Sequence, residues 1–340
     1  MSETQIREVG EFSLERALLD RVDELMKNSE QERVNNLKKL ISIYSNIKSV
    51  VYSKYYPEIA RLYPWYTDHG EKHVESIMMV LGEMLKQSFG RLNEMELFIL
   101  LCSCVFHDTG MAKSRAHHEQ EVLSIIQQIN KLILDISVNR QINQIAGAHT
   151  SKTDLKELNM KDSCTFSGRK YSVSTRALAA MLRFADDISE TRYRILPDLL
   201  EEGKVPKENE IYWQYAYIVE SVEVSVVEMN CLIKMTIPKS ILLKSLETSD
   251  GAEKIFFDYV LERIEKSNNE RIMCSLEFRN IVMISELYIE INIMTDDLMI
   301  TLDKRDIEAN EEYCYRRSLK DSFFDKNPSW TIDELRKNYS

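Results

Sequence analysis

Histidines are the residues of this chain best suited to chemistry, and all six lie between positions 69 and 149. Neutral imidazole nitrogens, together with carboxylate oxygens, bind divalent ions such as Mn, Mg, Fe, Co, Ni and Zn. One histidine alone is more often a surface or hydrogen-bonded core residue than a ligand. Because no histidine follows His149, the clustering indicates a shared role. We interpret it as a site for one or two divalent metal ions.

Some of these histidines share a helix face with apolar residues, which directs them toward a protein core. His73 lies four residues before Ile77 and eight before Leu81, so one helical stripe contains all three. His118 has the same spacing from two apolar residues, whereas its neighbour His117 aligns with polar ones. The pattern favours His118 as the inward residue and leaves the choice of ligand between the two open.

A carboxylate on the apolar stripe of a later helix adds to this set. Asp186 follows Leu182 by four residues, and His149 lies on an apolar stripe of its own helix. An unpaired buried carboxylate is very costly in free energy, and a metal ion would supply its partner. Asp187 shares a face with Arg183 instead, so we expect a surface ion pair there.

His107 and Asp108 are adjacent in the chain, which restricts how both could reach one site. Neighbouring side chains on a regular helix diverge by about 100°. They converge only where a helix ends or distorts, and Gly110 is well placed to end this one. The alternative is a structural histidine beside a loop carboxylate. That alternative would hold for any one residue, but the whole set favours a metal site.

Composition limits the partners of such a site. Hydrophobic residues make up 44% and charged residues 29% of 340 residues, as in an ordinary soluble globular protein. The formal net charge of −11 disfavours binding to long nucleic acids, which needs clustered Lys and Arg. A small phosphorylated substrate remains compatible, because a metal ion brings its own positive charge.

The location expected is cytoplasmic, with no membrane partner. The first residues are polar, unlike a signal peptide, and the longest apolar run, Leu97–Phe106, is shorter than a membrane span. Six cysteines are scattered without a Cys-x-x-Cys pair, so we expect reduced thiols and no thiolate zinc site.

Hydrophobic periodicity predicts a mainly α protein. Helices are expected at about 13–59, 71–85, 93–106, 117–134, 138–148 and 175–191, with a polar loop over 151–172. Strands are expected within 211–227, 231–237 and 287–294, with a helix over 252–267. The predicted domains are an N-terminal helical region (1–60), a metal-binding helical domain (61–203), a smaller α+β domain (204–305) and a charged helical tail (306–340).

Three ordered motifs resemble the signature of the HD superfamily of metal-dependent phosphohydrolases. They are His73-Val74-Glu75-Ser76-Ile77, Phe106-His107-Asp108-Thr109-Gly110 and Arg183-Phe184-Ala185-Asp186-Asp187. The resemblance covers roughly residues 60–195 and implies an HD-type helical bundle. It also implies that His73, His107, Asp108 and Asp186 are metal ligands.

Further matches refine the resemblance. The string Tyr66-Thr67-Asp68-His69-Gly70-Glu71-Lys72-His73 is similar to the paired histidines of cyclic-nucleotide phosphodiesterases in this superfamily, which implies a proton-donor role for His69. His118 and His149 match the extra histidines of two-metal members, in which the Asp of the pair bridges both ions. The strands expected from near Trp213 resemble those of bacterial HD proteins found beside Hsp90-like ATPases in conflict systems.

The chain also departs from the superfamily pattern. No Gly-Tyr-Pro motif follows, which disfavours the cyclic di-GMP branch. The lysine expected directly after His-Asp-x-Gly is displaced to Lys113, behind Met111 and Ala112.

The function expected is hydrolysis of a nucleotide or cyclic-nucleotide phosphoester by metal-activated hydroxide. Asp108, His69 and Lys113 are the expected catalytic residues, and Arg183 and Arg192 the expected phosphate contacts. Two alternatives are a non-catalytic, metal-stapled module that senses a nucleotide or binds a partner, and a single-strand nuclease. The α+β region is a candidate surface for a protein partner or a homo-oligomer.

Overall fold

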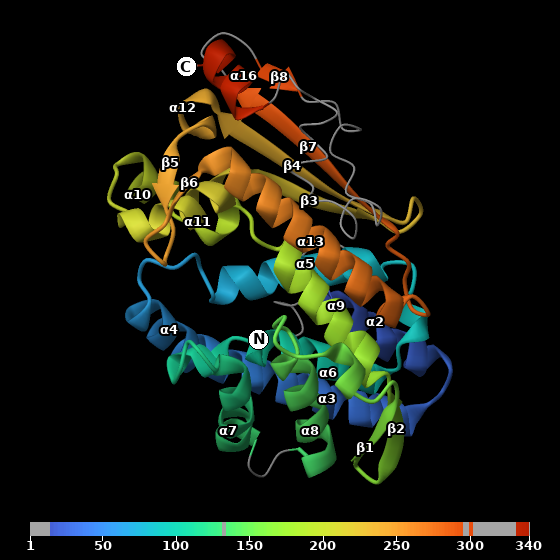
Figure 1. Cartoon of the computed structure of the whole chain (residues 1–340). Helices are drawn as coiled ribbons and strands as arrows, with labels where there is room; N and C mark the ends of the chain where they lie inside the picture. The colour runs from blue at the N-terminus through green and yellow to red at the C-terminus, as the bar shows by residue number, and fades with distance from the viewer. Residues whose placement is uncertain (1–13, 131–133, 295–298, 302–330, 340) are drawn as a thin grey trace. The chain divides into compact units, whose positions relative to one another are not determined.

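The computed structural model describes residues 14–130, 134–294, 299–301 and 331–339 (Figure 1). These residues belong to two compact units. The first, here called the helical unit, comprises Met1–Pro64, His69–Asp186 and Cys274–Met283. The second, the sheet unit, comprises Trp65–Asp68, Asp187–Met273 and Ile284–Ser340. The predicted domain boundaries stay a prediction.

The helical unit is built from helices that alternate with short connections. Its helices are α2 (Leu14–Lys27), α3 (Gln31–Val50), α4 (Tyr56–Leu62), α5 (Glu71–Leu85), α6 (Glu94–Phe106), α7 (His118–Asn130), α8 (Ile136–Gly147) and α9 (Thr175–Ile188), whose last two residues belong to the sheet unit. The shorter turns are η1 (Val51–Tyr55), η2 (Phe89–Arg91), η3 (Thr109–Ala112) and η4 (Leu155–Glu157). The mainly α class is confirmed.

Helix α6 forms the centre of this unit, because each of its residues is buried. Asn93 begins it with a capping box, in which its side chain accepts from Met95 N and Glu96 N while Glu96 accepts from Asn93 N. With the turn that follows, the segment Glu94–Ala112 is long and apolar enough for a membrane span. However, 94% of its apolar window is buried inside the protein, as in the core helix of a soluble protein.

A hairpin replaces part of the polar loop predicted over 151–172. Strands β1 (Asp162–Phe166) and β2 (Arg169–Val173) pair antiparallel. Ser167 and Gly168 connect them with φ of 49° and 80°, the backbone of a two-residue hairpin turn. The loop prediction was wrong here because the strands are short and carry many polar residues.

The larger sheet of the sheet unit has, among the described residues, the strand order β3-β4-β7-β8. These strands are β3 (Val219–Ser225), β4 (Asn230–Pro238), β7 (Glu286–Met294) and β8 (Met299–Thr301). The central pair, β4 and β7, is parallel, and the outer pairs are antiparallel. The chain between β4 and β7 includes α12 (Lys239–Leu242), a small hairpin of β5 (Ser245–Glu247) and β6 (Glu253–Ile255), and α13 (Phe256–Phe278), as Figure 1 shows. The residues of α13 from Cys274 on belong to the helical unit.

The strand predicted over 211–227 is wrong in its first half. Residues up to Ile218 form helix α11 (Lys207–Ile218), and the strand begins only at Val219. The buried residues of α11 include Ile211, Tyr215 and Ile218, which have helical spacing. The aromatic content of this segment imitates a strand, but Pro206 precedes a helix start rich in Glu.

The remaining short elements of the sheet unit are η5 (Arg192–Arg194), α10 (Pro197–Glu201) and α16 (Ile332–Tyr339). Most of the helical tail predicted over 306–340 lies outside the described residues.

Candidate metal centre

Six side chains from five parts of the helical unit meet in its interior. They are His73 from α5, His107 and Asp108 from the end of α6, His118 from the start of α7, His149 after α8, and Asp186 from α9. The first five are buried, and the side chain of Asp186 is 23% exposed. These residues are the six that the sequence nominates as metal ligands.

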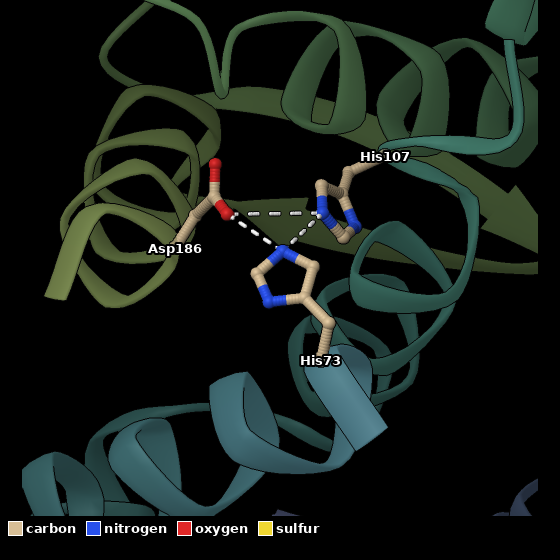
Figure 2. Close-up of side chains that lie close together, drawn as sticks. All are labelled: His73, His107 and Asp186. Atoms are coloured by element: carbon tan, nitrogen blue, oxygen red, sulfur yellow. Dashed lines mark hydrogen bonds and ion pairs between the residues drawn. The ribbon is translucent and has the colours of Figure 1, made fainter. Parts of the chain in front are cut away.

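His73, His107 and Asp186 form the first of two triads (Figure 2). His73 Nε2 lies 2.9 Å from Asp186 Oδ1 and 3.3 Å from His107 Nε2. The remaining separation, between His107 Nε2 and Asp186 Oδ1, is 3.9 Å. Ligand atoms about 2.0–2.2 Å from one divalent ion would have separations of this size. The triad could therefore hold a metal ion.

Asp108, His118 and His149 form the second triad. The Nε2 atoms of the two histidines are 2.9 Å apart. Asp108 Oδ1 lies 3.4 Å from His118 Nε2 and 3.6 Å from His149 Nε2. This set could hold a second ion.

Asp108 belongs to the second triad and also lies beside the first, so its two oxygens face different partners. Oδ1 faces the second triad, while Oδ2 lies 3.1 Å from His107 Nε2 and 3.8 Å from His73 Nε2. One carboxylate oxygen is thus within reach of each candidate ion. The arrangement is suited to a carboxylate shared by two metals.

Backbone carbonyls fix the orientation of three of the imidazole rings. The Nδ1 atoms of His107, His118 and His149 lie 2.8, 3.1 and 2.6 Å from the carbonyl oxygens of Cys104, Arg115 and Ala146. A carbonyl only accepts, so each Nδ1 donates, and in a neutral ring Nε2 then carries a lone pair. Two lone pairs 2.9 Å apart repel each other unless a cation lies between them. The donor set therefore fits a metal.

Charge makes the centre attractive to cations. Burial lowers the pKa of His107, but the charge of Asp108, the hydrogen bond to it and the charge of Asp186 raise that pKa to about 9. Burial raises the pKa of both Asp108 and Asp186, yet the surrounding histidines hold both well below the usual range. Both carboxylates stay ionised near neutral pH and can act as anionic ligands.

Gly110 allows the second triad to form. A Cβ placed on Gly110 would lie 1.9 Å from the carbonyl oxygen of His118. The turn after Asp108 therefore packs directly against the backbone at the start of α7. Only glycine permits this approach, which carries His118 to Asp108.

His69 lies beside the first triad. It is half-buried, and its ring centroid is 5.9 Å from that of His73. Its charge is among the influences that lower the pKa of Asp108. His118, the first residue of α7, is in the centre, whereas His117 in the turn before it is exposed in a pocket with Glu119, Asn143 and Lys152.

The basic residues proposed for catalysis or substrate contact have other partners. Lys113 is exposed, with Nζ 2.6 Å from Ser124 Oγ and 3.4 Å from Glu121 Oε2. Arg183 is buried and donates to Thr153 O at 2.9 Å. Arg192 belongs to the sheet unit, where it donates to Tyr217 O at 3.3 Å. The catalytic role expected for Lys113 and the phosphate contacts expected for Arg183 and Arg192 stay predictions.

Within the sheet unit, Asp187 pairs with Lys266 at 2.6 Å. The surface location predicted for Arg183 is wrong, because its side chain is buried and helix periodicity does not distinguish an exposed guanidinium from one enclosed by tertiary packing. The pairing of Arg183 with Asp187 stays a prediction.

One carboxylate near the centre is not evident from the sequence. Glu119 Oε2 lies 3.5 Å from His118 Nδ1, and the Glu119 side chain is 9% exposed. The Nδ1 proton of His118 goes to Arg115 O, so Glu119 interacts with the ring through its charge, and the charge of His118 is among the influences that lower the pKa of Glu119. Its position directly after His118 is the only sequence signal for it.

A family model described as HD-CE matches residues 63–266, which is more than half of the chain. No curated protein and no solved structure matches the chain.

Proposed function

Because the chain belongs to the HD-CE family, we propose that it is a metal-dependent phosphohydrolase that cleaves a phosphoester of the nucleotide or cyclic-nucleotide type. The observation that carries the proposal is the pair of triads on either side of Asp108. A purely structural metal site formed by histidines alone would not need a shared carboxylate. Two-metal hydrolysis, in contrast, uses two ions about 3.5–4 Å apart, which one carboxylate can bind together.

The proposed ligands divide between two ions. His73, His107 and Asp186 would hold the first, and His118 and His149 the second, with Asp108 shared. Mixed nitrogen and oxygen donors suit Mn, Fe, Co, Ni, Zn or Mg. Three or four protein ligands leave open positions for water and substrate, as catalytic metal sites require.

Divalent ions bound there would lower the pKa of water, so that hydroxide is available near neutral pH to attack phosphorus. Asp108 and Asp186 stay ionised because their pKa values are held low. The carbonyl bonds at Nδ1 hold the ligand rings in one orientation, which avoids reorganisation during the reaction.

His69 is the residue that we propose as proton donor to the leaving oxygen. It lies next to His73 but outside both triads, so its imidazole can carry a proton. A positioned general acid typically contributes roughly 10²–10⁴-fold to rate. The contacts of Lys113 and Arg183 support structural roles for these two residues rather than contact with substrate.

The test is metal analysis of the purified chain, followed by a phosphoester panel with added Mn or Mg. We expect up to two bound ions per chain and turnover of at least one nucleotide. His107→Ala and Asp108→Ala should lose metal and turnover while keeping most of the helical circular dichroism signal. His117→Ala, which removes an exposed imidazole from the same region, should retain both.

Full metal content and turnover in both ligand variants would contradict the proposal. Metal binding in the wild-type chain without turnover of any substrate would favour the non-catalytic module instead.

A further inference from the structure

The C-terminal end of α6 is buried, and metal ions bound at the proposed centre would not provide hydrogen-bond donors for its backbone carbonyl groups. The helix stops at Phe106 within the core, so that His107 and Asp108 can both face the triads. The last carbonyl groups of a helix lack amide partners, and burial removes water as a substitute. The residues around this end are buried, so these carbonyl oxygens need other donors.

Three side chains supply donors to consecutive carbonyls. His107 Nδ1 lies 2.8 Å from Cys104 O, Tyr56 donates to Val105 O at 2.7 Å, and Thr109 donates to Phe106 O at 2.7 Å. His107 and Thr109 belong to the turn itself. Tyr56 comes from α4, far earlier in the chain, and its side chain is buried.

The backbone before Tyr56 explains how its hydroxyl reaches α6. Pro57 follows it directly, and a proline clashes with the carbonyl four residues earlier in a regular helix. The chain here forms the wider π turn η1, which ends at Tyr55. Tyr55 and Tyr56 are then both buried, yet Tyr55 bonds Gln128 of α7 while Tyr56 bonds α6.

We propose that Tyr56 is a positioning residue of the metal centre. Its hydroxyl satisfies Val105 O and so holds the end of α6 in the geometry that directs His107 and Asp108 toward the two triads. The inference rests on the proposed function, because it assumes that metal binds at these triads. Without this bond, Val105 O would recruit the amide of residue 109 and extend the helix, which separates the two side chains.

The experiment compares Tyr56→Phe with Tyr55→Phe. Each variant removes one hydroxyl, and with it one hydrogen bond, from one of two adjacent buried tyrosines. The bond of Tyr56 is buried and that of Tyr55 is partly buried. Mn affinity is measured by titration calorimetry, and ligand geometry by the visible absorption spectrum of the Co-loaded chain. We expect Tyr56→Phe to weaken Mn binding about 10-fold or more and to change the Co spectrum. Tyr55→Phe should stay within about 2-fold of wild type, with an unchanged spectrum.

A second variant, Thr109→Val, tests the same end of α6 in case Tyr56→Phe does not fold. Thr109→Val removes the neighbouring bond to Phe106 O and should reproduce the weaker binding and the altered spectrum. The thermal unfolding midpoint in chelator measures the loss of stability of each variant without metal. A merely structural loss would lower this midpoint without changing the Co spectrum.

Equal Mn affinity and equal Co spectra in Tyr56→Phe and Tyr55→Phe would overturn the inference. No Mn or Co binding by the wild-type chain would instead be a failure of the proposed metal centre.

Discussion

At the scale of single residues, the centre depends on groups that are not ligands. Each of three ligand histidines donates Nδ1–H to the carbonyl three residues before it, and Gly110 leaves room for the backbone of His118. The first device fixes the direction of a lone pair, and the second fixes the distance between two segments. Both act before any ion is present, so the free energy needed to order the ligands is supplied during folding.

Gly110→Ala should damage the second triad selectively. The added methyl would lie 1.9 Å from His118 O, so the start of α7 must move away from Asp108. Overpacking of this kind costs about 1–3 kcal/mol of unfolding free energy. We expect that loss in urea unfolding, and metal analysis should show one ion fewer than in wild type.

Gly90→Ala is the matched control, because a Cβ at Gly90 meets nothing within 4 Å. It should keep the wild-type metal content. If Gly110→Ala also kept full metal content, Gly110 would have no part in assembling the second triad.

At the scale of elements, α6 is held at both ends. Its C-terminal end bears the motif residues, and its N-terminal end is tied to α3. Arg33 of α3 donates to both oxygens of Glu94, at 2.9 and 2.7 Å. The Glu94 side chain is 1% exposed, so this pair is the kind whose rupture leaves a buried charge. The pair therefore stabilises the helix that positions His107 and Asp108.

This pair should make stability depend on pH. Burial raises the pKa of Glu94, but the bond and charge of Arg33 lower it overall, below the ordinary 4.5. A lowered pKa in the folded state adds stability that is fully present above pH about 4.5 and is lost as pH falls through the lowered value. Arg33→Met should reduce the unfolding free energy by about 1–3 kcal/mol at neutral pH, and by less as pH falls below about 4.

Urea unfolding at several pH values measures this difference. Arg16→Met is the control, because its ion pair with Asp20 is exposed and should be worth only about 0.3–0.5 kcal/mol. If the difference in unfolding free energy between wild type and Arg33→Met did not shrink in acid, the Arg33–Glu94 pair would not be its source.

At the scale of the whole molecule, every proposed ligand belongs to the helical unit. Metal binding should therefore stabilise this unit by mass action. An ion present at 100 times its Kd adds about 2.7 kcal/mol to the unfolding free energy. The negative charge of the chain, −11, also favours the binding of cations.

Chelation should consequently lower the thermal midpoint of the helical circular dichroism signal by several degrees. Asp108→Ala, which removes the shared carboxylate, should show a much smaller change on chelation. A wild-type midpoint that is insensitive to both chelator and added Mn would count against a structural contribution from metal.

Much of the helical framework could be predicted from sequence, because helix signals are local. The apolar stripe of 71–85, the Asn93 cap and Gly110 lie within a few residues of the features that they define. Predictions failed where competing patterns are alike over short distances. The segment ending at Ile218 has strand-like composition but helical spacing, and the hairpin over 162–173 is largely polar.

Sequence alone was enough to predict which residues gather and in what order, since His73, His149 and Asp186 lie on apolar helix stripes and Gly110 follows the His107–Asp108 pair closely enough to end its helix. Tertiary packing was needed to show that His118 rather than His117 enters the centre and that the two oxygens of Asp108 face histidines of different triads. It also decided that Tyr56 caps α6. The physical reason is that periodicity along one helix gives direction, whereas the distance between groups on different helices depends on how their backbones pack.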